Sequence, residues 1–174
     1  MNERHFRAPW SPTLKVMSVT GSLILAAVSL TIALRSEPPA PVKALLGGVV
    51  VLTLAVSALF TVRGYALGHD ALYIKRLFWW TRIRLAGLRS IVVDRDACRR
   101  SIRLCGNGGL FAFAGWYRNR KLGRFRLCAT DLKRTVVLHF PDRTWVISPE
   151  NPQEFVRQVK SMARLPANPP DRFP

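Results

Sequence analysis

The sequence has few cysteines and few acidic residues. The first shortage excludes a class of protein, and the second predicts the kind of partner. Its three cysteines, Cys98, Cys105 and Cys128, are odd in number and lack a CxxC spacing. This pattern excludes a regular disulfide framework and argues against a zinc site. Only 10 Asp and Glu stand against 27 Lys and Arg, which gives a net charge of +17. We expect so basic a chain to face an anionic partner, such as phospholipid head groups, nucleic acid or an acidic protein.

The sequence also lacks the motifs that assemble a catalytic centre. It contains no HExxH, GxSxG or Walker spacing, and its three histidines, His5, His69 and His139, lie far apart in the chain. The three cysteines can meet across a hairpin, but free cysteine usually serves as a small buried hydrophobe. We therefore predict a protein that is not an enzyme, with no catalytic or metal-binding residues and no cofactor.

Charge is absent from two long apolar runs near the N-terminus. Each run holds 19 uncharged residues, at 16–34 and 44–62. As a helix, each run covers about 30 Å, the thickness of the hydrocarbon core, and neither shows the polar stripe of a soluble core helix. We predict two transmembrane helices with these bounds, joined by a short extracytoplasmic loop at 35–43 that contains three prolines.

Small residues recur at four-residue spacing within both runs. Ser18, Ser22 and Ala26 lie in the first run, and Ala44 and Gly48 lie in the second. Such residues allow helices to approach closely, so they form either the seam of the helical hairpin or a dimer contact. Neither run contains an ionisable side chain, which argues against an ion or proton pathway. We expect the two helices to act as an anchor.

The distribution of positive charge predicts the orientation of this anchor. The N-terminal tail, residues 1–15, carries three Lys or Arg, and residues 63–82 carry four, whereas the loop 35–43 carries two. The positive-inside rule therefore places both termini in the cytoplasm. Three unpaired cysteines also suit a reducing compartment. The chain is expected to be a multi-pass protein of the cytoplasmic membrane.

From Arg63 onward the pattern changes to short strands separated by turns. Turn signals such as His69-Asp70, DLKR and PDR divide roughly seven strands, which predicts an antiparallel barrel or sandwich. The last element differs, because Asn151 and Pro152 open it and Glu154 completes a capping box. Its apolar residues then repeat at i, i+4 and i+7. We predict a C-terminal helix that plugs one end of a barrel.

Several stretches carry a family resemblance. GNGG followed by GWY, then LGRFRLCAT, and above all ISPENPQEFV at 147–156 resemble bacterial pleckstrin-homology (PH)-like domains over about residues 63–163. The resemblance implies an α+β, mostly β fold: a transmembrane helical hairpin in the bacterial inner membrane, then a PH-like domain at 63–165. That domain is a seven-stranded barrel capped by a C-terminal helix. Cys128 stands where the family usually has an aromatic residue, which implies a slightly altered core. The Pro-rich tail 166–174 is predicted to be disordered.

Two basic stretches are candidate contact sites. LYIKRLFWWTRIR, at 72–84, places aromatics at a hairpin tip between cations, as a lipid-facing surface requires. The alternative is that the aromatics pack on the barrel or on the ends of the spans and that the cations are only solvated. The candidate lipid or partner contacts here are Lys75, Arg76, Phe78, Trp79, Trp80, Arg82 and Arg84.

The second stretch is GNGGLFAFAGWYRNRKLG, at 106–123. As a phosphate cradle it fails, because Phe111 stands where GxGxxG requires glycine and no GK[ST] follows. We interpret it as a barrel corner that carries a basic loop, in which the glycines permit tight bends. Arg118, Arg120 and Lys121 of this loop are further candidate contacts.

These patterns predict a binding or scaffold module that contacts anionic lipid head groups or a protein partner at the cytoplasmic membrane face. The alternative is a structural accessory subunit of a larger inner-membrane complex, and a homo-oligomer is a further option. A nucleic-acid groove built from Trp116, Tyr117 and the surrounding arginines is the least favoured explanation. No familiar nucleic-acid module matches, and a membrane anchor makes that role unusual.

Overall fold

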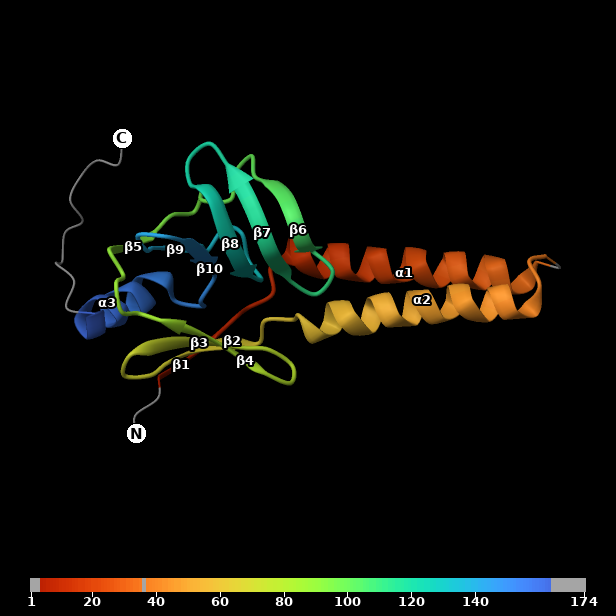
Figure 1. Cartoon of the computed structure of the whole chain (residues 1–174), viewed down its shortest axis with the longest axis horizontal. Coiled ribbons are helices and arrows are strands. Elements are labelled where there is room, and N and C mark those ends of the chain that lie inside the picture. Colours follow the sequence, from red (N-terminus) through yellow and green to blue (C-terminus); the bar gives the residue numbers. More distant parts are fainter. Residues whose placement is uncertain (1–3, 36, 164–174) are drawn as a thin grey trace.

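Two long helices project side by side from a β-rich domain in the computed structural model, which describes residues 4–35 and 37–163 (Figure 1). The helices are α1 (Pro12–Leu34) and α2 (Ala40–Leu59). Both are long and apolar enough to cross a membrane, and only 6% and 0% of their apolar windows are buried. They are therefore candidate membrane spans and not core helices of the domain. The predicted disordered tail, 166–174, lies outside the described residues.

Helix α1 begins inside the domain, four residues before the predicted span. Ser11 is its N-cap, and the Ser11 hydroxyl accepts a hydrogen bond from the Leu14 N–H (3.1 Å). The Ser11 N–H in turn donates to the Thr130 carbonyl (3.2 Å), and the Leu14 side chain is fully buried. The first turn of α1 thus belongs to the core, which fixes the direction in which the helix leaves the domain.

The first sheet has four antiparallel strands in the order β1-β2-β3-β4. They are β1 (Arg4–Arg7), β2 (Gly64–Leu67), β3 (Ala71–Lys75) and β4 (Trp80–Arg84). Strand β1 lies in the segment 1–15, which the sequence predicts to be a tail. It pairs closely with β2, because a Cβ on Gly64 would lie 2.8 Å from the Phe6 carbonyl oxygen. The N-terminal residues from Arg4 onward are therefore part of the domain.

The second sheet has six strands in the order β5-β9-β10-β8-β7-β6, and all its pairs are antiparallel except β10 with β8. They are β5 (Ser90–Val93), β6 (Ile102–Gly108), β7 (Phe113–Asn119), β8 (Gly123–Ala129), β9 (Val136–His139) and β10 (Thr144–Ile147). The two sheets are not joined into a closed barrel. The seven-stranded barrel is thus corrected to ten strands in two sheets within the described part of the chain. The predicted strand pattern lacks β1, which precedes α1, and β7, which lies within the expected corner 106–123.

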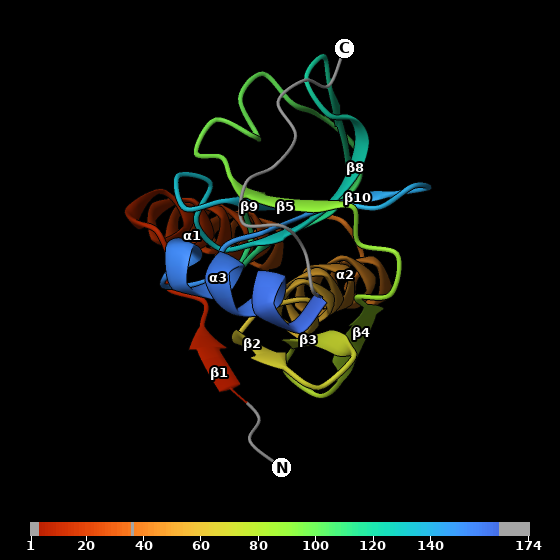
Figure 2. The same cartoon turned by 90° about the vertical axis from the view of Figure 1, so that its left-hand side faces the viewer.

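Helix α3 (Pro152–Ala163) lies across the opening between the two sheets, which confirms the predicted C-terminal helix (Figure 2). Phe155 and Val159 on its inner face are fully buried. The Phe155 ring contacts the rings of Phe6 (5.1 Å) and Tyr65 (6.4 Å) edge-on. The main core therefore joins β1, β2 and α3, elements that are far apart in the sequence.

A second apolar cluster covers the other face of the six-stranded sheet. Phe125, Leu127 and Val146 from the sheet pack there with Leu14 of α1. The sheet is thus buried on both faces where it meets the start of α1. This packing ties the direction of the helix pair to the sheet.

Candidate functional site

The β3–β4 hairpin ends in an exposed aromatic tip. Lys75 pairs with Trp80 in the ladder, and the Arg76 N–H closes the turn on the Trp79 carbonyl (2.9 Å). Phe78 is 78% exposed, Trp80 48% and Trp79 36%. The hairpin predicted from 72–84 is confirmed, with Trp80 as the first residue of β4. Exposed clusters of apolar side chains are typical of interaction surfaces.

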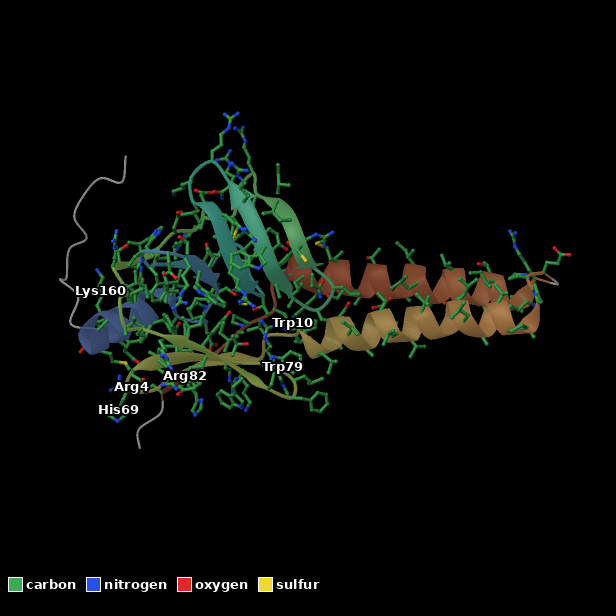
Figure 3. All side chains as sticks on the ribbon, viewed as in Figure 1. Arg4, Trp10, His69, Trp79, Arg82 and Lys160 are labelled. Atoms are coloured by element: carbon green, nitrogen blue, oxygen red, sulfur yellow. The ribbon has the colours of Figure 1, made fainter. Side chains whose placement is uncertain are left out.

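This tip lies beside the end of α2. Phe60 follows the last residue of the helix, and its ring meets the Trp79 ring edge-on at 5.5 Å. Figure 3 shows Trp79 next to the domain end of the helix pair. The tip therefore lies at the level where α2 leaves its apolar run.

Arg76 holds the tip in this position from within the protein. Its side chain is buried, and its guanidinium donates to the Phe60 carbonyl (2.8 Å), just past the end of α2. It also donates to the Thr81 hydroxyl (3.2 Å) and to the Cys128 sulfur (3.3 Å). A cation at a helix C-terminus interacts favourably with the helix dipole. Because Arg76 does not reach the surface, we correct its predicted role: it positions the tip and is not a head-group contact.

The partner of Arg76 on β8 is a neutral thiol. Burial raises the pKa of Cys128, and the nearby Arg76 and Arg126 offset that shift only in part. The Arg76–Cys128 contact is therefore a hydrogen bond to a thiol and not an ion pair. Next to it, the Tyr65 hydroxyl donates to the Cys128 carbonyl (2.8 Å) and accepts from the Ser148 N–H (3.1 Å). Burial raises the pKa of Tyr65 as well. The tip thus rests on a base of buried, hydrogen-bonded side chains.

The remaining predicted cations of this hairpin are spread along it. The Lys75 ammonium lies over the Trp80 ring (5.4 Å), close to the tip. Arg82 lies farther from the helices and pairs with Asp70 at 2.7 Å (Figure 3). Arg84 is exposed at the far end of β4. The structure therefore brings Lys75 and the three aromatics together and places Arg82 and Arg84 away from them. We call Lys75 and residues 77–80 the aromatic tip.

The second predicted set lies on a different surface. Arg118 is in β7, and Arg120 and Lys121 are in the β7–β8 connection, which points away from the helix pair (Figure 1). Lys121 forms an ion pair with Asp94 at 2.5 Å. These residues line a cleft of about 1020 Å³ together with others, including Arg99. The two predicted sets therefore do not form one site.

The sequence does not predict one contact between α1 and the domain. The Ser18 hydroxyl of α1 donates to the Gly109 carbonyl (3.2 Å) and accepts from the Phe111 N–H (2.9 Å). Small residues at 18, 22 and 26 predict either the seam of the hairpin or a dimer contact, but Ser18 is buried against the β6–β7 turn. No local signal indicates this partner, which lies about ninety residues away in the sequence.

The cysteines occupy three separate environments. Cys105 is exposed on β6, Cys128 is buried beneath the aromatic tip, and Cys98 packs against the second apolar cluster. Burial and the charge of Asp94 raise the pKa of Cys98 to about 12. Within residues 4–35 and 37–163, no three His, Cys, Asp or Glu side chains are close enough together to hold a metal ion.

Two sheets and a covering C-terminal helix define a PH-like domain. A sequence profile described as bacterial PH domain matches residues 63–163, more than half of the chain. The chain therefore belongs to the bacterial PH domain family. Comparison with curated proteins gave no match, and comparison with solved structures gave none either. Strand β1 and the start of α1 lie outside the matched range but complete the domain in this chain.

Proposed function

We propose that this protein is a membrane-anchored PH-like binding module that contacts anionic phospholipid head groups at the cytoplasmic membrane face. In this proposal α1 and α2 cross the membrane as a hairpin, and the aromatic tip lies on the leaflet from which they emerge. The observation that carries the proposal is the exposure of Phe78, Trp79 and Trp80 beside the end of α2. A PH-like domain is generally a binding module without catalysis, which supports the same class of function.

The chemistry of the tip suits the boundary between water and lipid. Aromatic rings partition to the interfacial layer, and a neighbouring cation attracts anionic head groups. Lys75 supplies that cation, at about 1 kcal/mol for a charge held near an anionic leaflet. The spans hold the tip close to the bilayer, so the contact forms at a high effective concentration. Arg76 adds preorganisation, because it bonds the tip to the end of α2.

A photo-crosslinker in place of Phe78 tests the proposal in native membranes. With benzoylphenylalanine at this position in the full chain, we expect the main adduct found by mass spectrometry to be a phospholipid, enriched in anionic species. The same crosslinker at Arg120, on the β7–β8 connection, is the matched control and is expected to give little lipid adduct. An absence of lipid adducts at position 78, or equal yields at both positions, would sink the proposal.

The orientation has its own test. The excess of Lys and Arg in residues 1–15 and 63–82 over the loop 35–43 supports cytoplasmic termini. A reporter that functions only in the cytoplasm is expected to be active when it is fused after the last residue, Pro174. A reporter that is active only outside the cytoplasm would overturn this topology.

One observation favours a second candidate, an accessory subunit of a larger membrane complex. Gly47 and Gly48 in the middle of α2 have open space where a side chain would be, so another helix can approach there. On this alternative, the crosslinker at Phe78 or a pull-down of the full chain in mild detergent captures a defined polypeptide. A chain that purifies as a monomer without partners would remove the support for it.

A further inference from the structure

The β6–β7 turn, residues 109–112, runs along the first turns of α1 instead of stopping at the surface of the domain (Figure 1). It contacts Met17, Ser18 and Gly21 on one face of the helix. A Cβ on Gly109 would lie 2.8 Å from the Met17 methyl carbon, and a Cβ on Gly21 would lie 3.4 Å from the Leu110 side chain. The turn therefore lies beside residues that belong to the apolar run of α1.

The position of these helix residues gives the depth of the turn. Lys15 is the last charged residue before the run, and Ser18 and Gly21 follow it by three and six positions. At 1.5 Å per residue, they lie about 4.5 Å and 9 Å farther along the helix axis. The head-group layer of one leaflet is about 5–7 Å thick. With Lys15 at the outer edge of this layer, a turn at the level of Ser18 and Gly21 reaches the boundary between head groups and acyl chains.

We propose that the β6–β7 turn is embedded in the cytoplasmic leaflet, with Leu110 and Phe111 in contact with the acyl chains. The inference rests on the anchorage by α1 and α2 that the proposed function includes. It adds a second lipid contact, beside α1, to the aromatic tip beside α2. Both side chains are only half-buried by the protein, so each has surface left for lipid.

The backbone of the turn meets the main requirement for non-helical chain at this depth. In hydrocarbon, each unpaired N–H or C=O is costly, so irregular backbone there needs protein partners. Ser18 supplies two of them, because its hydroxyl binds the Gly109 carbonyl and the Phe111 N–H at once. The same pairing satisfies the buried Ser18 hydroxyl both as donor and as acceptor.

The turn satisfies further polar groups internally. The Asn107 side chain accepts from the Leu110 N–H (3.1 Å) and donates to the Leu110 carbonyl. The Gly109 N–H donates to the Ala112 carbonyl (3.1 Å). Both polar groups of Gly109 and of Leu110 thus have protein partners, as does the Phe111 N–H. A turn that faced only water would not need this pairing.

Phe111 adopts a conformation that bulky residues rarely take. Its φ is 67°, in the left-handed region, where an aromatic residue is a genuine outlier. Such strain persists only where the surroundings enforce it, and it concentrates at functional positions. Here the Ser18 hydroxyl holds the Phe111 N–H, and the Phe111 ring lies 6.3 Å from that of Trp10. The conformation places an aromatic ring beside the start of α1, where an interfacial residue is expected.

A cation is also placed for the phosphate layer. The Arg103 guanidinium lies against Gly108, at the base of the turn on β6. On the same edge strand, Ile102 and Leu104 are 71% and 51% exposed. An apolar turn followed by a cation matches the order of acyl chains and phosphates across a leaflet.

A fluorescent label at position 110 tests the inference in the full chain. The starting protein carries Cys98→Ala and Cys105→Ser and keeps the buried Cys128. Leu110→Cys is then labelled with the environment-sensitive fluorophore NBD and reconstituted into phosphatidylglycerol-containing nanodiscs. We expect blue-shifted emission and strong quenching by lipids that carry a nitroxide near the head group. A label on Arg120→Cys, the matched control, is expected to emit as in water.

A third label separates failure of this inference from failure of the anchor. Ala27→Cys lies in the middle of α1 and is expected to be quenched by nitroxides deep in the acyl chains. If the label at 27 is quenched but the label at 110 behaves like the one at 120, the turn is not embedded and the anchor stands. If the label at 27 also emits as in water, the anchor fails, and with it both this inference and the proposed function.

The role of Ser18 has a matched pair of variants. Ser18→Ala removes both hydrogen bonds to the turn, so we expect at least a twofold loss of quenching at position 110. Ser22→Ala, one helical turn farther along α1, is expected to leave the quenching unchanged. Equal quenching in Ser18→Ala and Ser22→Ala would overturn the role assigned to Ser18 in holding the turn.

Discussion

The β3–β4 and β7–β8 hairpins are both basic and both carry tryptophan, yet they differ in where they point and in what their side chains contact. The β3–β4 hairpin ends beside α2 and exposes Phe78 and Trp79 at its tip. The β7–β8 hairpin ends away from the helices (Figure 1), and Lys121 in its turn pairs with Asp94. Position relative to α1 and α2 therefore distinguishes two stretches that are alike in charge.

The two hairpins also use arginine differently. In β3–β4, Arg76 is buried and bonds the tip to the carbonyl of Phe60. On the outer surface of β8, Arg124 stacks on the Trp116 ring at 4.5 Å, and both arginines 124 and 126 stay exposed. One arginine joins the end of α2 to the domain, whereas the others cover an aromatic surface. Variants that separate these roles test the comparison.

Arg76→Ala is expected to have the largest effect. The change removes a buried cation together with its three hydrogen bonds, and it leaves a cavity at the junction of α2, β4 and β8. We expect a loss of about 3 kcal/mol, or roughly 6–12 °C in Tm for a chain of this size. The measurement is thermal unfolding of the full chain in mild detergent, followed by tryptophan fluorescence.

Arg82→Ala is the matched control in the same hairpin. Arg82 pairs with Asp70 where both side chains are largely exposed, so we expect a loss below about 1 kcal/mol. Equal shifts in Tm for the two variants would contradict the assignment of Arg76 as the residue that joins the tip to α2.

The reactivity of Cys128 and Cys98 reports on the packing near Arg76 and near Lys121. In the native chain, we expect maleimide to label Cys105 quickly, because it is exposed, and Cys98 slowly, because its pKa of about 12 leaves little thiolate near pH 8. Arg76→Ala opens the site over Cys128, and we expect its labelling rate to rise because the gain in access outweighs the loss of a cation that favours the thiolate. Peptide mass spectrometry after timed quenching measures each site.

The corresponding change at the other hairpin is Lys121→Ala. It removes the ion pair between an exposed lysine and the mostly buried Asp94, and Cys98 keeps its packing, so the labelling rate of Cys98 is expected to stay the same. A rise at Cys98 in this variant, or no rise at Cys128 in Arg76→Ala, would contradict the different roles assigned to Arg76 and Lys121.

Lys75→Ala tests the charge at the aromatic tip. Loss of about 1 kcal/mol of attraction to an anionic leaflet corresponds to about a fivefold lower preference for phosphatidylglycerol. The yield of anionic-lipid adducts from the crosslinker at position 78, relative to zwitterionic adducts, measures this preference. Arg84→Ala, at the far end of β4, is the control and is expected to change it little.

Lys121→Ala is expected to have the smallest effect on stability. Its partner Asp94 is mostly buried, but the lysine side chain is 61% exposed, so the free energy of unfolding should change by less than about 1 kcal/mol. Thermal unfolding of this variant and of Arg76→Ala in mild detergent measures the difference in stability between them. A loss as large as that of Arg76→Ala would remove the contrast between the hairpins.

Strong local signals made much of the fold predictable. The capping residues before Phe155 identified α3, and alternation around the 78–80 aromatics identified the β3–β4 hairpin. The two uncharged runs located α1 and α2 to within about four residues at each end, as expected when helix ends are read from composition. Local chemistry sufficed for these elements because their own residues determine them.

Other features depend on partners that a local pattern does not contain. Strand β1 has four residues and pairs with β2 about sixty residues later, so no periodicity marks it. The glycines around Phe113–Asn119 concealed strand β7. The burial of Arg76 and the pairing of Ser18 with Gly109 both follow from the direction in which the helices leave the domain. That direction is a property of the packed structure and is not visible in composition.

The most direct test of the account compares the two hairpin tips in one reconstituted preparation. Nitroxide spin labels on Phe78→Cys and Arg120→Cys, in the chain that carries Cys98→Ala and Cys105→Ser, report collisions with oxygen, which dissolves in lipid, and with a water-soluble nickel chelate. We expect collisions with oxygen to dominate at position 78, in the leaflet, and collisions with the nickel chelate to dominate at position 120, in water. Equal accessibility to the nickel chelate at both positions would contradict the account.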